Sequence, residues 1–519
     1  MAERECWKSR TGMILAMAGN AVGLGNFLRF PVQAAQNGGG SFLIPYFIAL
    51  ILISVPIMWV EWAIGRNGGR HNHGSLPGMF DLLWKNPIAK YLGAIGLFGS
   101  TIILIYYAYI VSWTLGFSFF SLFKTYFGLT SFDGMSSFLG SYQGASVGYF
   151  SSGWLAYLFM LLTFAFIFWI MKRGVSGGIE KLALFALPAL FIFAIILAIR
   201  VFTLGTPDPV NHPDWSVAKG FAFLWNPNFE MLGDAKIWLA AAGQIFFSLS
   251  VGMGTLQAYA SYLKPEDDIA LSGLSTASIN ELAEVVLGAV IAIPVAVAFF
   301  GLDVTIQVAE GGSFNLAFVS MPVIFQKLPF GEIFGFLWFF LLFFAGITSV
   351  VAMAQPLISF IEERFEISHN KATTYVGIFT LIALHFVFFF FQYGFLDEMD
   401  YWAGTFILVV IAFIEVVIFA WIFGMDKGWE EFNTGADIKI PIIFKYITKY
   451  VTPIFLFVIL ISWTIQDAIP ILMMKGISPE NIPYRWGARL LMLAILFTIM
   501  YMVHIAWKKN KRKPVSFDS

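Results

Sequence analysis

Two apolar stretches of the sequence are each interrupted near their middle by glycines and polar side chains. The first reads NAVGLGNFLRF from Asn20 to Phe30, and the second reads SLSVGMGT from Ser248 to Thr255. A helix broken inside a membrane leaves backbone groups without hydrogen-bond partners, which is costly unless something else satisfies them. Freed carbonyl oxygens suit a small hard cation, and freed amides at the start of a half-helix suit a carboxylate. Together the two stretches predict a site that holds a cation beside an anionic head group.

Glycines in a membrane helix have a second explanation, because they also let neighbouring helices pack closely. That explanation would suffice for either stretch alone. However, Gly23 and Gly25 of the first stretch are matched by Gly252 and Gly254 of the second, and polar residues flank both pairs. Paired interruptions in two halves of one chain favour a transporter's binding site.

The composition indicates an integral membrane protein. Of the 519 residues, 59% are hydrophobic and only 12% are charged, whereas a soluble domain carries about 25% charged residues. A net charge of −1 gives no reason to expect a nucleic-acid partner. The single cysteine, Cys6, excludes an internal disulfide framework. The sequence contains no phosphate-binding loop, nucleophile–base pair or metal-ligand cluster, so it indicates neither an ATP-driven pump nor an enzyme.

A membrane-spanning helix needs about 20 apolar residues. Twelve stretches meet this need, so we predict an all-α, polytopic membrane protein with twelve transmembrane helices. The predicted spans are centred on residues 11–35, 41–65, 88–122, 153–171, 180–203, 236–262, 271–300, 331–361, 371–392, 399–423, 441–467 and 486–507.

The basic residues predict the orientation of these spans. Lys and Arg gather before the first span, between the second and third, after the fourth and after the twelfth. Since basic loops stay in the cytoplasm, we expect a multi-pass plasma-membrane protein with both termini inside. The sequence has no Asn-linked glycosylation acceptor, which favours a bacterial source. Nothing in it indicates an obligatory partner subunit.

Seven segments carry a resemblance to a known family. They read GNAVGLGNFLRFP, WVEWAIGR, IYYAYIVSWTLGF, GQIFFSLSVGMG, SGLSTASINELAEV, FLWFFLLFFAGITS and LDEMDYWAGT. In these segments the chain resembles the neurotransmitter:sodium symporter family, particularly its bacterial amino-acid transporters. The resemblance covers the first ten spans and weakens in the last two.

The resemblance implies a LeuT-like fold in a single transporter domain. That fold is a five-plus-five inverted repeat in which helices 1 and 6 are unwound at mid-membrane. Here the first repeat would span residues 11–203, the second 236–423, two peripheral helices 441–507 and a cytoplasmic tail 508–519.

Two sodium sites follow from the resemblance, and all their implied ligands are oxygens, as sodium prefers. The first set comprises the Ala21 carbonyl, Asn26, Ser248 and Asn280, completed by the substrate carboxylate. The second set comprises the carbonyls of Gly19, Val22 and Ala345 and the hydroxyls of Thr348 and Ser349. Alternatively, these two hydroxyls could bond to a carbonyl one turn earlier in their own helix.

The resemblance also implies a substrate pocket. Its residues would be Ala21, Gly25, Ile103, Tyr107, Phe247, Ser250, Met253, Ser349 and Met353. Tyr107 should donate its hydroxyl to the substrate carboxylate. Family members that carry monoamines have an aspartate at position 23, where this chain has glycine, so its substrate should bring its own carboxylate. The remaining wall is apolar, which predicts a neutral, mainly hydrophobic amino acid.

Several charged residues have implied roles. Glu284 would replace the chloride ion of animal relatives, with Tyr46, Gln244 and Ser248 around it. Arg29 and Asp400 would form an outer gate over the substrate, and Arg4 and Glu363 an inner gate. Glu61 would brace the broken region from the second span. These implied positions are Arg4, Arg29, Glu61, Glu284, Glu363 and Asp400.

The resulting hypothesis is a chloride-independent, sodium-coupled symporter of neutral amino acids that works by alternating access with two sodium ions. Two alternatives remain on the same architecture. A sodium-independent amino-acid exchanger would lack a complete second set of oxygen ligands. A membrane amino-acid sensor would bind without moving its ligand across the bilayer.

Overall fold

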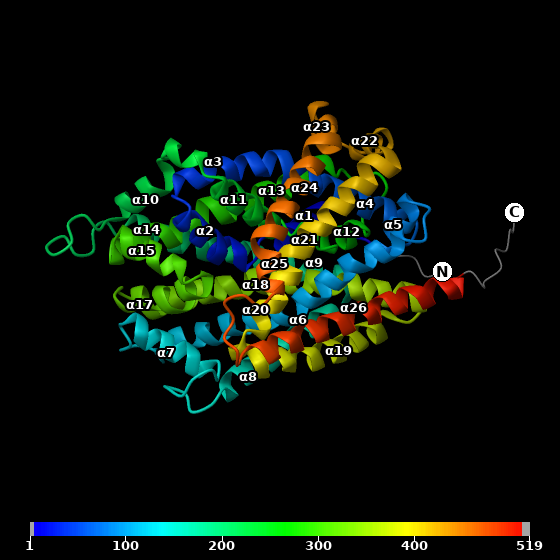
Figure 1. The fold of residues 1–519 in the computed structure, drawn as a ribbon. Helices are drawn as coiled ribbons and strands as arrows, with labels where there is room; N and C mark the ends of the chain where they lie inside the picture. Colours follow the sequence, from blue (N-terminus) through cyan, green and yellow to red (C-terminus); the bar gives the residue numbers. More distant parts are fainter. Residues whose placement is uncertain (1–4, 511–519) are drawn as a thin grey trace, which may run out of the picture.

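The computed structural model describes residues 5–510, and in this range the chain is helical without strands. Long helices run side by side through the molecule (Figure 1). The continuous spans are Gly40–Arg70 (α3, η2, α4), Ala89–Leu122 (α6), Trp154–Met171 (α8), Val175–Phe202 (η3, α9), Ala270–Glu310 (α13, η5, α14, α15), Gly331–Phe365 (α18), His369–Tyr393 (α19, η7), Phe395–Asn433 (α20, η8, α21, η9, α22), Ile443–Leu472 (α23, η10, α24, η11, α25) and Ile482–Lys509 (in α26).

Shorter helices cover the ends of this bundle. They are α5 (Leu76–Leu83), α7 (Phe132–Tyr142), α10 (Val217–Trp225), η4 (Phe229–Gly233), α16 (Ser313–Asn315), η6 (Leu316–Ser320) and α17 (Met321–Gln326). The helix α26 runs on to Asn510, so the predicted tail at 508–519 begins inside a helix. Residues 511–519 lie outside the described range.

Helices α6 and α18 pack against each other at the centre of the bundle (Figure 1). The apolar stretch of α6 is 94% buried and that of α18 is 83% buried, whereas the last two spans are only 17% and 28% buried. A helix that is apolar on all sides and buried belongs in a core, and one that is apolar but exposed faces lipid. The last two spans therefore lie at the periphery.

The first span is broken. Helix α1 (Arg10–Ala21) ends before Val22, and the chain resumes as η1 (Gly25–Arg29) and α2 (Phe30–Gln36) at a bend of 48°. Val22 is extended, with ψ 93°, and its amide closes α1 by donating to the Ala18 carbonyl at 2.6 Å. This interruption confirms the predicted unwinding of the first helix.

The second interruption falls between α11 (Ala235–Ser248) and α12 (Thr255–Ala260). Ser250, Gly252 and Gly254 have φ of 53°, 77° and 76°, a left-handed region in which glycine has no steric penalty. A Cβ on Gly252 would lie 2.2 Å from the carbonyl oxygen of Leu408 in α21. The glycine thus supplies both the turn and the close approach of α21.

The two breaks explain the number of spans in the structure. Ten helices among residues 5–510 are long and apolar enough to cross a membrane, and the bent first span makes eleven. Helices α11 and α12 occupy the predicted sixth span, but neither half is long enough alone. The total of twelve therefore remains a prediction.

Gly252→Ala should destabilise the second break, because alanine is strained at positive φ and its Cβ would overlap the Leu408 carbonyl. We expect a clear fall in the thermal unfolding midpoint of the detergent-purified protein. Gly205→Ala is the matched control: its φ is 63°, but its Cβ meets nothing within 4 Å in the described part of the chain. Strain alone costs about 1–2 kcal/mol, so equal losses for the two variants would contradict the packing role of Gly252.

Candidate functional site

Tyr107 of α6 and Asn26 of η1, just after the break, satisfy the amides that the first break exposes. The Tyr107 hydroxyl accepts the Leu24 amide at 2.9 Å, and Asn26 Oδ1 accepts the Gly23 amide at 2.8 Å. At the same level, Ser250 Oγ donates to the Asn20 carbonyl at 2.9 Å. The two breaks therefore meet, with α6 beside them.

A first group of oxygen-bearing side chains lies where η1, α11 and α13 meet. One end of the Asn280 side-chain amide lies 2.8 Å from Asn26 Nδ2 and 3.3 Å from the carbonyl oxygens of Ala21 and Ser248. Its other end lies 2.7 Å from Ser248 Oγ. The structure thus brings together all four residues of the first predicted sodium set.

A second group joins α1 to α18. Ser349 Oγ lies 3.4 Å from the Gly19 carbonyl oxygen, 3.3 Å from that of Asn20 and 3.1 Å from that of Ala345. Thr348 Oγ1 donates to the Ala345 carbonyl at 3.0 Å and to the Phe344 carbonyl at 3.0 Å. Both hydroxyls thus make the bonds to their own helix that the sequence left as an alternative.

The approach of α1 to α18 in this second group is close. A Cβ on Gly19 would lie 3.1 Å from Thr348 Cβ. Val22, the remaining member of the predicted set, caps α1 with its extended backbone. The Asn20 carbonyl was not predicted here, and it accepts from both Ser250 and Ser349.

The chemistry of these donors fits a hard monovalent cation. Both groups consist of carbonyl, amide and hydroxyl oxygens, which sodium prefers. In the described residues, the structure gathers no group of three or more His, Cys, Asp or Glu side chains that could hold a metal ion. The carbonyl, amide and hydroxyl oxygens of the two groups could hold such a cation.

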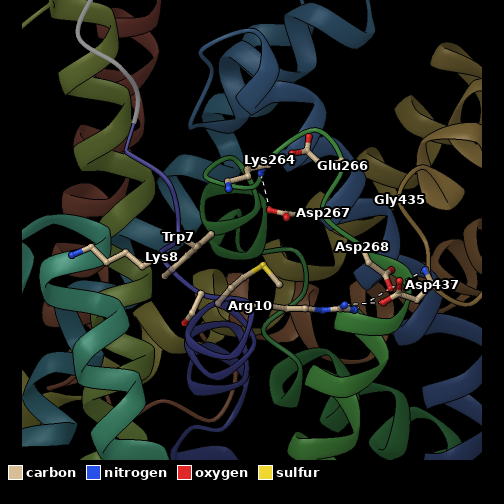
Figure 2. Close-up of a pocket in the computed structure, with 11 residues that line it drawn as sticks. Trp7, Lys8, Arg10, Lys264, Glu266, Asp267, Asp268, Gly435 and Asp437 are labelled. Carbon is tan, nitrogen blue, oxygen red and sulfur yellow. Dashed lines mark hydrogen bonds and ion pairs between the residues drawn. The ribbon is translucent and has the colours of Figure 1, made fainter.

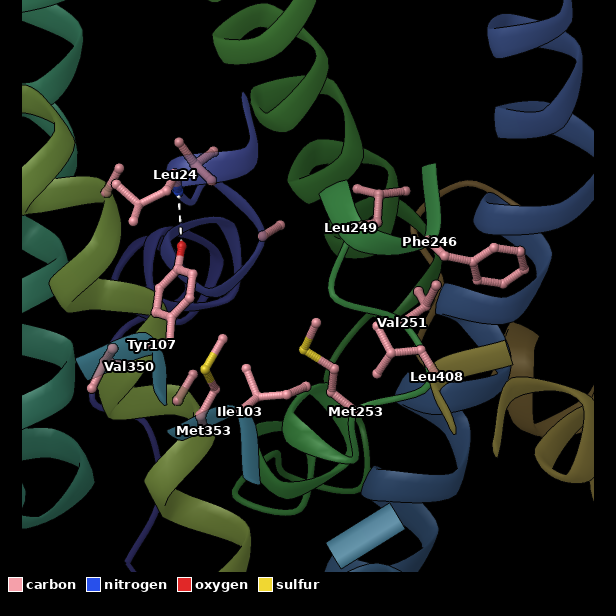
Figure 3. Close-up of a cluster of buried hydrophobic side chains, with 14 of the residues drawn as sticks. Leu24, Ile103, Tyr107, Phe246, Leu249, Val251, Met253, Val350, Met353 and Leu408 are labelled. Carbon is pink, nitrogen blue, oxygen red and sulfur yellow. Dashed lines mark hydrogen bonds between the residues drawn. The ribbon is translucent and has the colours of Figure 1, made fainter. Parts of the chain in front are cut away.

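A cluster of buried apolar side chains lies beside the two oxygen groups. Ile103 of α6, Met253 of the second break and Met353 of α18 belong to it and lie below the bond between Tyr107 and the Leu24 amide (Figure 3). Val350 and Leu408 belong to the same cluster and were not predicted (Figure 3). No signal in the sequence could have found Leu408, because α21 approaches the second break through its packing on Gly252.

The two glycines of the first break, Gly23 and Gly25, allow side chains of other helices to come close to the backbone. A Cβ on Gly23 would lie 2.9 Å from Ser349 Oγ and 3.1 Å from the Tyr107 hydroxyl. A Cβ on Gly25 would lie 2.6 Å from the Phe247 ring. Any side chain at position 23 would therefore enter the space between the hydroxyls.

A cavity of about 270 Å³ leads toward this site from the side of α16. Arg29, Tyr107, Phe247 and Asp400 line it, together with Phe314. The Arg29 guanidinium lies over the Phe247 ring, 4.7 Å from its centroid, while Asp400 accepts a hydrogen bond from the Tyr106 hydroxyl at 2.6 Å.

Arg29 and Asp400, the predicted outer-gate residues, make no direct ion pair with each other in the described part of the chain. Tyr106 is a partner of Asp400 that sequence reasoning missed. The run YYAY offered two adjacent tyrosines, and only packing shows that one reaches Leu24 and the other Asp400.

Glu284 lies fully buried beside the first oxygen group. Its carboxyl accepts from Gln244 at 2.7 Å, from Asn26 at 3.0 Å and from the Ser248 hydroxyl. Tyr46, predicted to surround Glu284, lies close to it and donates its hydroxyl to the neighbouring Glu281 at 3.2 Å. Glu281 was not predicted, and its place beside Asn280 in the sequence was the available signal.

Glu61 contacts the second break directly. Its Oε1 accepts the Gly252 amide at 2.5 Å, and its side chain is fully buried. A buried carboxyl group thus satisfies an amide that the unwound backbone exposes.

The opposite side of the molecule is held by polar contacts to the start of α1. Trp7 Nε1 donates to the Tyr259 carbonyl at 3.1 Å, and Arg10 pairs with Asp268 at 3.1 Å and Asp437 at 2.7 Å (Figure 2). A cavity of about 230 Å³ is lined by Trp7, Arg10, Asp268 and Asp437 (Figure 2). Glu363 accepts the Gly74 amide at 2.8 Å. Its predicted partner Arg4 lies outside the described residues.

Comparisons with known proteins extend over nearly the whole chain. The model of the sodium:neurotransmitter symporter family matches residues 4–129 and 146–510. An uncharacterised sodium-dependent transporter of Methanocaldococcus jannaschii is 32% identical over 459 residues, which cover 88% of this chain and 89% of the relative. The sodium- and chloride-dependent GABA transporter 2 of Rattus norvegicus is 25% identical over 497 residues, covering 87% of this chain and 78% of the relative.

A solved structure shows the same fold. The crystal structure of MhsT in complex with L-phenylalanine superimposes with a TM-score of 0.75 at 27% sequence identity. The match covers 89% of this chain and all, 100%, of that chain. It confirms the predicted all-α, LeuT-like architecture.

Thr348→Val should weaken sodium binding, because it removes one oxygen of the second group and keeps the shape of the side chain. A ligand that binds only the folded state stabilises it by about 2.7 kcal/mol at a hundred times its Kd. We therefore expect sodium, but not choline, to raise the thermal midpoint, and the variant to lose most of that rise. Thr163→Val, at a buried threonine of α8, should keep it. An unchanged sodium response in Thr348→Val would contradict the assignment.

Proposed function

Since the chain belongs to the sodium:neurotransmitter symporter family, we propose that it couples sodium entry to the uptake of neutral, mainly hydrophobic amino acids. Proteins of this family are secondary transporters rather than enzymes, and the chain is accordingly a multi-pass membrane transporter. The amino-acid class, the two sodium ions and chloride independence belong to the proposal.

The observation that carries the proposal is the junction of the two breaks. The Tyr107 hydroxyl lies at the Leu24 amide, beside Gly23, so a carboxylate placed there would meet both groups. The Asn26–Asn280 oxygen group lies on the other side of the same break. A substrate carboxylate in this position would complete the first sodium shell, so sodium and substrate would strengthen each other's binding.

The cluster of apolar side chains beside the oxygen groups supports the proposed class of neutral, mainly hydrophobic amino acids. Ile103, Met253 and Met353 carry no charge, so a neutral side chain is expected to fit between them. Methionine is flexible and fills irregular gaps, which favours large aliphatic or aromatic side chains. The structural relative MhsT was crystallised in complex with L-phenylalanine, an amino acid of this class.

Glu284 supports chloride independence. Its carboxyl lies among Gln244, Ser248 and Asn26, where it can supply the negative charge that chloride would bring. A carboxyl group inside the membrane is costly and usually functional. During the return of the empty carrier, a proton bound to Glu284 would neutralise that charge.

Alternating access would use the two cavities in turn. Sodium and amino acid enter through the cavity lined by Arg29 and Asp400, and these two residues then approach each other and close it. The contacts of Trp7 and Arg10 on the opposite side must then break for release. The first described residues and the end of α26 lie at the same end of the bundle (Figure 1), which agrees with both termini in the cytoplasm.

The sodium gradient would supply the driving force. Moving one charge across 100 mV is worth about 2.3 kcal/mol. Two sodium ions would thus contribute roughly 4–5 kcal/mol, enough for a substrate concentration ratio of about a thousandfold.

Proteoliposomes with an inward sodium gradient should accumulate radiolabelled L-phenylalanine, and replacing sodium by choline should abolish uptake. Replacing chloride by gluconate should leave it unchanged, since Glu284 supplies the anion. Competition by the twenty amino acids would then identify the preferred substrate.

Each alternative gives a different result in this assay. Uptake that persists in choline would identify a sodium-independent exchanger. Binding without accumulation would identify a sensor. Strict dependence on chloride would refute the role of Glu284.

A further inference from the structure

A buried charge cluster joins the start of α20 to the two peripheral spans. Glu398 has a fully buried side chain and accepts from Arg489 Nε at 2.6 Å and Arg485 Nη1 at 3.2 Å, both from α26. Trp402 Nε1 donates to the same carboxylate at 2.7 Å. The exposed fraction of the Arg489 side chain is only 7%.

Arg489 also holds the end of the preceding span. Its guanidinium donates to the carbonyl oxygens of Ile471 at 2.7 Å and Leu472 at 3.0 Å, which end α25. Free carbonyls at a helix C-terminus attract a cation. One arginine thus connects the start of the tenth predicted span with both peripheral spans.

Further contacts strengthen this connection. Tyr484 at the start of α26 stacks on Tyr393, with ring centroids 3.9 Å apart and planes at 9°. Arg485 also pairs with Asp397 at 3.6 Å. The segment from Tyr393 to Glu398 is therefore held against α26 along its whole length.

The turn that carries Glu398 has two faces with different partners. Asp400 lines the outer cavity and accepts from Tyr106, whereas Glu398 and Trp402 face the arginines of α26. Asp397 lines the same cavity and also pairs with Arg485. Residues three and four apart share a helix face, so anchoring 398 and 402 sets the direction of 397 and 400. The wide π-helical turn η8 (Asp400–Phe406) begins at Asp400, and such turns are frequent at functional sites.

We propose that Arg489, acting through Glu398, is a positioning residue for the outer-gate acid Asp400. The anchored turn holds Asp400 on the Tyr106 hydroxyl and ready to meet Arg29 when the cavity closes. The peripheral spans, α23–α25 and α26, thereby take part in gating. This inference rests on the proposed function, in which closure of that cavity follows substrate binding.

The test uses the paired variant Arg489→Gln/Glu398→Gln, which leaves no lone charge buried in the cluster. In nanodiscs, hydrogen exchange of amides 399–406 should become about tenfold faster than in the unchanged protein, while peptides of α6 keep their rate. Leu490→Ala, at a neighbouring lipid-facing residue that is 63% exposed, should leave both rates unchanged. This readout requires no substrate, so it stands even if the proposed function fails.

A second readout measures gating itself. In a Cys6→Ser background, Ile110→Cys places a thiol in the outer cavity, and sodium with L-phenylalanine should protect it from labelling. The paired variant should need about tenfold more L-phenylalanine for the same protection, and Arg489→Lys should recover part of the loss. In an Asp400→Asn background the paired substitution should raise the required L-phenylalanine concentration little further, because the two changes act on the same gate.

Three results would overturn the inference. One is unchanged exchange of residues 399–406 in the paired variant. Another is that the paired variant raises the L-phenylalanine concentration needed for protection by the same factor in the Asp400→Asn background as in the unchanged protein. Arg489 would then stabilise the fold independently of Asp400. The third is unimpaired protection in the paired variant. Failure of the unchanged protein to respond to sodium and L-phenylalanine would instead count against the proposed function.

Discussion

The structure depends on backbone groups that two broken helices leave without helical partners. In a hydrocarbon environment such groups must find partners within the protein or on a bound solute. Here side chains satisfy the amides: Tyr107 and Asn26 at the first break and Glu61 at the second. The carbonyl oxygens gather with hydroxyl and amide groups of α13 and α18, an arrangement that a cation satisfies well.

The same constraint connects binding to movement. Each half of a broken helix contacts different neighbours: the start of α1 is held by Asp268 and Asp437, while η1 lies against Tyr107 and Asn280. In the proposed function the breaks carry the ions and the substrate, so their occupancy would act on both halves at once. A continuous helix would transmit rotation but would offer neither free oxygens nor a hinge.

The two breaks were predictable, because their determinants are local in the sequence. Glycines at 23, 25, 252 and 254 mark the breaks directly, whereas the oxygen-bearing residues of α13 and α18 were named only through the family resemblance. What the sequence could not predict depends on packing between distant elements. Tyr46 reaches Glu281 as well as Glu284, and Tyr106 reaches Asp400, through orientations of α3 and α6 that no periodicity reveals.

The peripheral position of the last two spans was predicted, but their link to the gate was not. Arg489 and Glu398 lie 91 residues apart, and each alone is a charge at the end of an apolar run.

The central claim, that one unwound junction holds sodium and substrate in direct contact, is tested by equilibrium binding on the purified protein. Reciprocal coupling between two sites is a thermodynamic necessity if they share a ligand. We expect saturating sodium to tighten L-phenylalanine binding, and saturating L-phenylalanine to tighten sodium binding by the same factor, about 5–150-fold. Affinities that are independent of each other would contradict the account.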